Sequence, residues 1–119
     1  MRRPSTEFVD LRDALRRFAA AREWEQFHTP KNLAMALAVE AAELLEHFQW
    51  LTPAQSAQLD ARRKREVADE IADVLLYLTR LADVLGIDAV AAARRKIRVN
   101  ARKYPVRRAK GNARKYSEL

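Results

Sequence analysis

Apolar residues recur every three or four positions along most of the chain, the spacing that places them on one face of an α-helix. The first such segment can be capped by Ser5 or Thr6 and ends near Arg22. Its apolar face would be formed by Phe8, Leu11, Leu15 and Phe18. A polar and aromatic connection, residues 23–28, follows this predicted helix.

Two further segments open with the same start signal. Threonine followed by proline, at positions 29–30 and 52–53, combines an N-cap residue with proline at the first helical position. The first pair predicts a helix that extends to about Leu51. The second pair predicts a short helix or turn that ends near Asp60.

The second half of the chain contains two more predicted helices. One covers roughly residues 62–85 and stops at Gly86, the residue type that most readily adopts the left-handed C-terminal cap. The other begins after the capping residue Asp88 and reaches about Arg102. Pro105 prevents this last helix from continuing.

Composition favours an all-α fold. The 119 residues support one domain, and they include only two glycines and four prolines. We therefore predict a four-to-five-helix bundle. Leu75 and Leu76 lie outside the main apolar stripe of their helix, so that helix should be buried by more than one neighbour, as in a dimer or tetramer. Because cysteine is absent, disulfides and thiolate metal sites are excluded.

Charge divides the chain into two parts. Residues 1–93 carry 12 Lys/Arg and 15 Asp/Glu, a net charge of −3, whereas residues 94–119 carry 11 Lys/Arg and one acid, a net charge of +10. We predict a helical domain over residues 1–104 and a basic tail over residues 105–119 that packs on the same or a neighbouring subunit. Such a tail could contact nucleic acid, the phosphates of a nucleotide or an acidic partner. No apolar run approaches the ~20 residues that span a bilayer and no signal peptide is visible, so we expect a cytoplasmic protein.

Four acidic residues share a helical phase that is unusual for a small core. Glu40 and Glu43 lie at the edge of the apolar stripe of the second predicted helix, and Glu70 and Asp73 lie at the matching edge of the third long one. If these helices pack together, the four carboxylates converge and repel one another. Mg²⁺ or Mn²⁺ would remove this repulsion, since both favour carboxylate oxygens, water and substrate phosphate as ligands.

Two other interpretations of the acids remain open at this point. The first is that they are solvated charges at the border of a helix face, some of them paired with arginine. The second is a di-iron bundle, which would require Glu-x-x-His on two helices. His47 follows Glu43 by four residues and the third helix contains no histidine, so the pattern for di-iron is incomplete.

Four ordered motifs resemble one known family. They are REWEQFH-x-P-K-N, VEAAELLEHFQW, EVADEIADVLLYL and KIRVNARKYP. Together they resemble the all-α nucleotide pyrophosphohydrolases of the MazG-like family, in particular the branch that includes the dCTP pyrophosphatases. The resemblance implies Mg²⁺-dependent hydrolysis between the α- and β-phosphates of a nucleoside triphosphate, and the substrates it implies are dCTP or modified pyrimidine deoxynucleoside triphosphates. It also implies dimers or tetramers with sites bordered by two subunits.

The resemblance also implies roles for individual residues of the 1–104 domain. The metal ligands would be Glu40, Glu43, Glu70 and Asp73, with Glu43 as the candidate that activates water. The phosphate contacts would be Lys96, Asn100, Lys103 and Tyr104. The base-binding residues would be Trp24, His28, Trp50 and Tyr77, although large aromatic residues also fill cores. Leu15 stands where the related dCTP enzymes carry a histidine, which leaves the preferred base open.

Two functions of other classes are alternatives to this enzyme. A nucleic-acid-binding helical module would use the basic tail and would not need the acids. An inactive assembly protein would keep the bundle without turnover, and the presence of all four signature acids argues against it.

Overall fold

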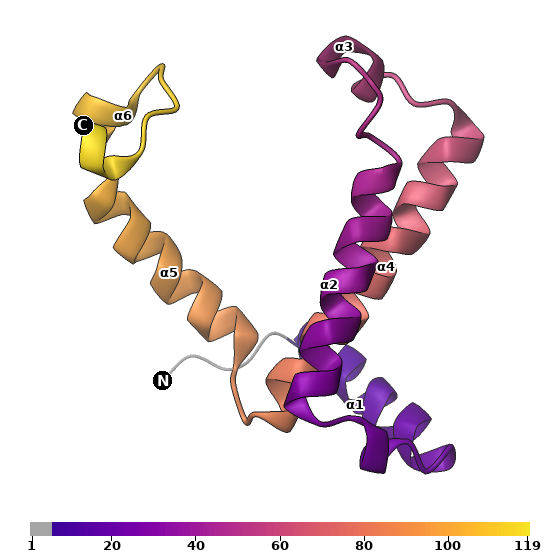
Figure 1. Cartoon of the computed structure of the whole chain (residues 1–119). Coiled ribbons are helices and arrows are strands. Elements are labelled where there is room, and N and C mark those ends of the chain that lie inside the picture. The colour runs from indigo at the N-terminus through magenta and orange to yellow at the C-terminus, as the bar shows by residue number, and fades with distance from the viewer. Residues whose placement is uncertain (1–5) are drawn as a thin grey trace.

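Regular structure in the chain is entirely helical across residues 6–119, the part that the computed structural model describes (Figure 1). The helices are α1 (Thr6–Ala21), α2 (Pro30–Glu46), α3 (Pro53–Ser56), α4 (Ala61–Val84), α5 (Ala89–Lys103) and α6 (Val106–Ala109). Short 3₁₀ helices cover Glu25–Phe27 and Tyr116–Glu118. The prediction of an all-α fold is confirmed, and the possible cap Ser5 lies outside the described residues.

Side-chain caps begin four of these helices. The capping oxygens belong to Thr29, Thr52, Asp60 and Asp88, and each accepts a hydrogen bond from a backbone N–H of the first turn. Thr52 and Gln55 form a reciprocal capping box at the start of α3. At the other end of α4, Gly86 adopts a φ of 69°, the left-handed conformation that its position predicted.

The predicted end of the second helix, near Leu51, is wrong. Helix α2 ends at Glu46, and the next four residues form turns. Thr52 must be extended to cap α3, with φ −72° and ψ 161°, so the helix has to stop before it. Arg63 of α4 donates a hydrogen bond of 3.0 Å to the carbonyl oxygen of His47, which gives this helix end a partner across the fold.

The core lies where α1, α2 and α4 meet. Helices α2 and α4, joined through α3, pack along each other, and α1 packs on α4 (Figure 1). Ala19, Leu33 and Thr79 are each only 1% exposed at this junction. Thr79 donates a hydrogen bond of 2.7 Å to the carbonyl oxygen of Leu75, so its buried hydroxyl is satisfied.

Helix α5 diverges from this core. It runs away from the α2–α4 pair and, among the described elements, packs extensively on none of the other long helices (Figure 1). The C-terminal segment folds against the end of α5, where the rings of Tyr104 and Tyr116 meet edge to face with centroids 6.2 Å apart. That the basic tail also packs on a neighbouring subunit stays a prediction. None of the helices in residues 6–119 has both the length and the apolar character needed to cross a membrane.

Candidate metal and nucleotide site

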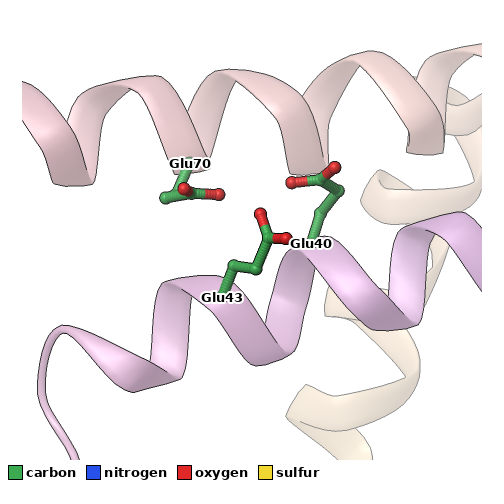
Figure 2. Close-up of side chains that lie close together, drawn as sticks. All are labelled: Glu40, Glu43 and Glu70. Atoms are coloured by element: carbon green, nitrogen blue, oxygen red, sulfur yellow. The ribbon is translucent and has the colours of Figure 1, made fainter.

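Three carboxylates converge between α2 and α4. Glu40 and Glu43 project from α2 and Glu70 projects from α4, and one oxygen of each lies within 4.8 Å of the others (Figure 2). The i, i+3 spacing puts the two residues of α2 on the face that packs against α4. We call Glu40, Glu43 and Glu70 the carboxylate cluster.

The carboxylate cluster is electrostatically unfavourable without a ligand. One oxygen each of Glu40 and Glu70 is buried and has no hydrogen-bond partner among residues 6–119. Burial, together with the neighbouring Glu43, raises the pKa of Glu40 to about 7. Burial is also the main reason why the pKa of Glu70 is raised, and the charge of Glu43 adds to it.

No Lys, Arg or His side chain of residues 6–119 forms an ion pair with this cluster. None of the ion pairs within residues 6–119 includes Glu40, Glu43 or Glu70, which argues against a cluster of solvated salt bridges. His47 lies 4.0 Å from Glu66 instead of joining the cluster, so a di-iron site gains no support. Buried, unpartnered carboxylate oxygens are hard ligands and fit Mg²⁺ or Mn²⁺.

Asp73, the fourth predicted ligand, lies next to the carboxylate cluster. Its carboxylate is outside the 4.8 Å group, yet its charge contributes to the raised pKa values of Glu40 and Glu70. It also lines a cavity of about 260 Å³. Asp73 therefore connects the cluster with the cavity.

Three of the four predicted base-binding residues line this cavity. They are Trp24, His28 and Tyr77, and the walls between them are largely apolar. Trp50, by contrast, is 86% exposed in the turn after α2 and does not line the cavity. Leu15, at the position where the sequence departs from the family pattern, forms part of the apolar wall.

The backbone after α1 fixes Trp24 in place. Glu23 adopts a φ of 53°, and the N–H of Trp24 donates to the carbonyl oxygen of Ala19 at 3.0 Å. This is the arrangement of a Schellman cap, with glutamate where glycine is common. The Trp24 ring then meets Phe18 and His28 edge to face, at centroid distances of 5.7 and 6.4 Å.

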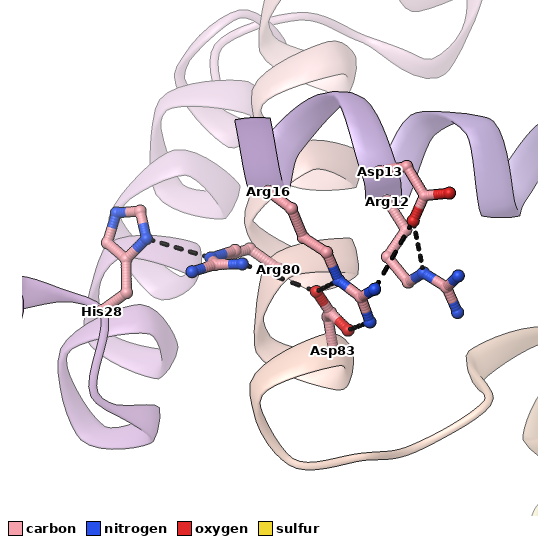
Figure 3. Close-up of polar contacts among 6 residues, drawn as sticks. All are labelled: Arg12, Asp13, Arg16, His28, Arg80 and Asp83. Atoms are coloured by element: carbon pink, nitrogen blue, oxygen red, sulfur yellow. Dashed lines mark hydrogen bonds and ion pairs between the residues drawn. The ribbon is translucent and has the colours of Figure 1, made fainter. Parts of the chain in front are cut away.

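A network of charged residues borders the cavity and was not predicted. Arg80 donates from Nε to Nδ1 of His28 at 3.1 Å, and Asp83 accepts two hydrogen bonds from Arg16 at 2.6 and 2.8 Å (Figure 3). The hydrogen bond from Arg16 is the main reason why the pKa of Asp83 is lowered. Arg80 follows Tyr77 by three residues and Asp73 by seven, so the helical face of the predicted site could have identified it.

The predicted phosphate-binding residues lie apart from the carboxylate cluster within one chain. They are all exposed on α5 or at its C-terminal end: Lys96, Asn100, Lys103 and Tyr104. Because α5 diverges from α2 and α4, one chain does not bring these residues and the carboxylates together (Figure 1).

Known proteins are similar to this chain over most of its length. A model of the MazG-like family matches residues 35–119. dCTP pyrophosphatase 1 of Homo sapiens is 40% identical over 118 residues, which cover 98% of this chain and 69% of that protein. The Bos taurus dCTP pyrophosphatase 1 is 42% identical over 113 residues, 92% of this chain and 66% of that protein. A crystal structure of a pyrophosphatase from Archaeoglobus fulgidus is similar with a TM-score of 0.80 at 45% identity, covering 88% of this chain and 98% of the other.

Proposed function

Since the chain belongs to the MazG-like family, we propose that it hydrolyses dCTP or a related or modified pyrimidine deoxynucleoside triphosphate in an Mg²⁺-dependent reaction. In general terms this is the activity of a nucleoside triphosphate pyrophosphatase, which agrees with the names of the similar proteins. The products are the nucleoside monophosphate and pyrophosphate. The role we propose is removal of unwanted nucleotides from the cytoplasmic pool.

The carboxylate cluster is the observation that carries this proposal. Two buried carboxylate oxygens, on Glu40 and Glu70, lack any hydrogen-bond partner in the described part of the chain. Leaving such groups unpaired is costly, and a divalent cation is the ligand that their chemistry fits. Glu40, Glu43, Glu70 and Asp73 would hold one or more Mg²⁺ ions.

The metal ion, the attacking water and Glu43 would each have a separate task in the hydrolysis. When bound, Mg²⁺ neutralises triphosphate charge and makes a bound water more acidic. Water adds to the α-phosphorus, the bond to the bridging oxygen breaks, and pyrophosphate leaves with that oxygen. Glu43 would orient the attacking water and accept its proton, because this carboxylate lies between the two helices that hold the cluster (Figure 2).

The cavity beside the cluster supports a base-binding role. Trp24 and Tyr77 offer aromatic faces, and stacking of a base on such a ring contributes about 1–3 kcal/mol. Asp73 borders both the cavity and the cluster, so a nucleotide could place its base in the cavity and its phosphates at the carboxylates.

Assembly would supply the cations that one chain does not place at the cluster. We propose that Lys96, Asn100 and Lys103 contact the phosphates bound to another subunit of a dimer or tetramer. The apolar side chains exposed along the outer face of α4 support burial by a neighbour: Ile71, Leu75 and Leu78. Residues 94–119 carry a net charge of +10 and residues 1–93 a net charge of −3, and this difference favours the same contact between subunits.

Mixing two inactive variants tests assembly. Glu40→Gln removes a cluster residue and Asn100→Ala removes a phosphate contact. If each site combines two subunits, a dimer with one copy of each variant has one site in which both the carboxylate cluster and Asn100 are intact. We expect the mixture, refolded together, to hydrolyse dCTP at least about tenfold faster than either variant alone. Activity no higher than the average of the two variants would contradict shared sites.

Incubation with a panel of deoxynucleoside triphosphates tests the function itself. We expect equimolar monophosphate and pyrophosphate with Mg²⁺, and no products with excess chelator. In ¹⁸O-labelled water, the label should appear in the monophosphate, because attack occurs at the α-phosphorus. If no nucleotide is hydrolysed and the chain instead binds DNA in a salt-sensitive manner, the nucleic-acid-binding alternative is correct.

A further inference from the structure

We infer that Arg80 determines base specificity, because together with His28 it makes one wall of the base cavity a hydrogen-bond donor. Both residues line the cavity of about 260 Å³ that also contains Trp24 and Tyr77. The inference rests on the proposed function and adds a substrate class to it. Keto-pyrimidine triphosphates, such as dUTP, are hydrolysed at least as efficiently as dCTP.

The Arg80 guanidinium has free donors at this wall. Its side chain is only 11% exposed, and Nε donates to Nδ1 of His28 at 3.1 Å. One further N–H reaches Asp83 at 3.5 Å. A guanidinium has five N–H groups, so three have no hydrogen-bond partner among residues 6–119.

The contact with Arg80 also fixes the tautomer of His28. Because Nδ1 accepts the hydrogen bond from Arg80, a neutral His28 carries its proton on Nε2, which is then a donor. Burial first, and the charge of Arg80 second, lower the pKa of His28 and favour that neutral form. Both side chains therefore offer N–H groups.

Asp83 and Arg16 are positioning residues for Arg80. Arg16 occupies both oxygens of Asp83 at 2.6 and 2.8 Å, whereas Arg80 makes only the longer contact of 3.5 Å (Figure 3). Arg16 also contacts Asp13 at 3.6 Å, but it still makes the short hydrogen bonds to Asp83. The Arg80 guanidinium is therefore only weakly paired and keeps its charge at the cavity wall. This charge strengthens hydrogen bonds to carbonyl oxygens.

Hydrogen-bond donors at the cavity wall favour bases that present hydrogen-bond acceptors to it. Uracil and thymine present a carbonyl oxygen at the 4-position, where cytosine presents an amino group that is itself a donor. Two donors that face each other leave both groups unpaired, which is how a polar site discriminates. Among the described residues that line the cavity, Asp73 is the one carboxylate, and because it borders the carboxylate cluster we assign it to the metal and not to the base.

Paired kinetics with dUTP and dCTP test this inference, since the two nucleotides share the sugar and the triphosphate. For the unsubstituted chain, kcat/KM for dUTP should equal or exceed that for dCTP. Arg80→Met should lower the ratio of kcat/KM for dUTP to that for dCTP by about tenfold or more, mainly through KM. Arg80→Lys should restore part of the ratio because it keeps the charge.

A matched control separates specificity from stability. Arg65→Met removes an exposed arginine of the same helix and should leave the ratio unchanged. If Arg80→Met lowers kcat/KM equally for both nucleotides, Arg80 only supports the fold and the inference is wrong. Dissociation constants of the products dUMP and dCMP, followed by tryptophan fluorescence, give the same ratio without turnover. Thus absent hydrolysis would refute the proposed function alone, whereas an unchanged binding ratio would refute the role of Arg80.

Discussion

Helix α4 contributes to two groups of charged residues that are built in opposite ways. In the carboxylate cluster, Glu70 meets Glu40 and Glu43, so like charges lie together with buried oxygens that lack partners in the described residues. Thirteen residues further along α4, Asp83 meets Arg16 and Arg80, so opposite charges are paired and hydrogen-bonded (Figure 3).

This difference predicts which substitutions along one helix affect catalysis first and which affect stability first. Paired charges stabilise the fold that contains them, whereas a group of like charges destabilises it until a ligand arrives. A residue lost from the carboxylate cluster should therefore abolish activity without harming the fold. A residue lost from the Asp83 pair should cost stability first.

The largest expected effect is on catalysis. Glu40→Gln should reduce kcat/KM by about 10³-fold or more, because a metal ligand is lost while the shape of the side chain is kept. The metal-free variant should unfold at the same temperature as the unsubstituted chain or at a higher one, since one like charge has been removed. Glu46→Gln, an exposed acid of α2, is the matched control and should retain activity. Equal activity of both variants would contradict the ligand assignment.

A second prediction concerns the metal-free protein at different pH. The pKa of Glu40 is about 7 in the folded chain and its ordinary value is 4.5, so the folded state binds more protons between these values. Relative to Glu40→Gln, the unfolding free energy should therefore fall as pH rises from about 4.5 to about 7. Mg²⁺ at 100 times its dissociation constant should raise the unfolding free energy of the unsubstituted chain by about 2.7 kcal/mol at pH 8. Denaturant titrations that show no difference between the two proteins would contradict the burial of this carboxylate.

A smaller effect is expected for the ion pairs that Asp83 forms with Arg16 and Arg80. Asp83→Asn should lower the unfolding free energy at neutral pH by about 1–2 kcal/mol, because charge-assisted hydrogen bonds are lost. The pKa of Asp83 is lowered in the folded chain, so its stabilisation is present above the ordinary value of 3.8 and disappears as pH falls through the folded value. Asp69→Asn, an exposed acid of the same helix, should change stability by less than about 0.5 kcal/mol. Equal destabilisation by both variants would show that the pair contributes nothing specific.

Much of the helical framework follows from local signals in the sequence. Thr29, Thr52 and Asp88 cap helices through their own side chains, and Gly86 adopts the left-handed conformation that ends α4. The convergence of Glu40 with Glu70 followed from matched helical phase. The caps depend on neighbours in the chain, and the convergence depends on the regular period of two long helices, so patterns in the sequence are sufficient to predict both.

Features that depend on contacts between distant residues were not predicted. The premature end of α2 involves Arg63, which lies 16 residues beyond the carbonyl oxygen that it binds. The contact between His28 and Arg80 spans 52 residues. The family resemblance implied a base-binding role for Trp50, but α2 stops before this residue, which is exposed and does not line the cavity.

Helix α5 and the segment after it leave apolar side chains exposed within the single chain. Ile97 is 68% exposed and Val106 is 76% exposed, although both are apolar. Their burial by a neighbouring subunit is part of our proposal on assembly. The caps of α5 could be predicted, whereas its position relative to the carboxylates could not.

Binding of Mn²⁺, measured by electron paramagnetic resonance with Mg²⁺ as competitor, tests the central claim most directly. The unsubstituted chain and Glu46→Gln should bind Mn²⁺ saturably, and Mg²⁺ should displace it. Glu40→Gln should lose at least about tenfold in affinity. Equal affinity in all three proteins, or no saturable binding by the unsubstituted chain, would contradict a divalent-cation site at the carboxylate cluster.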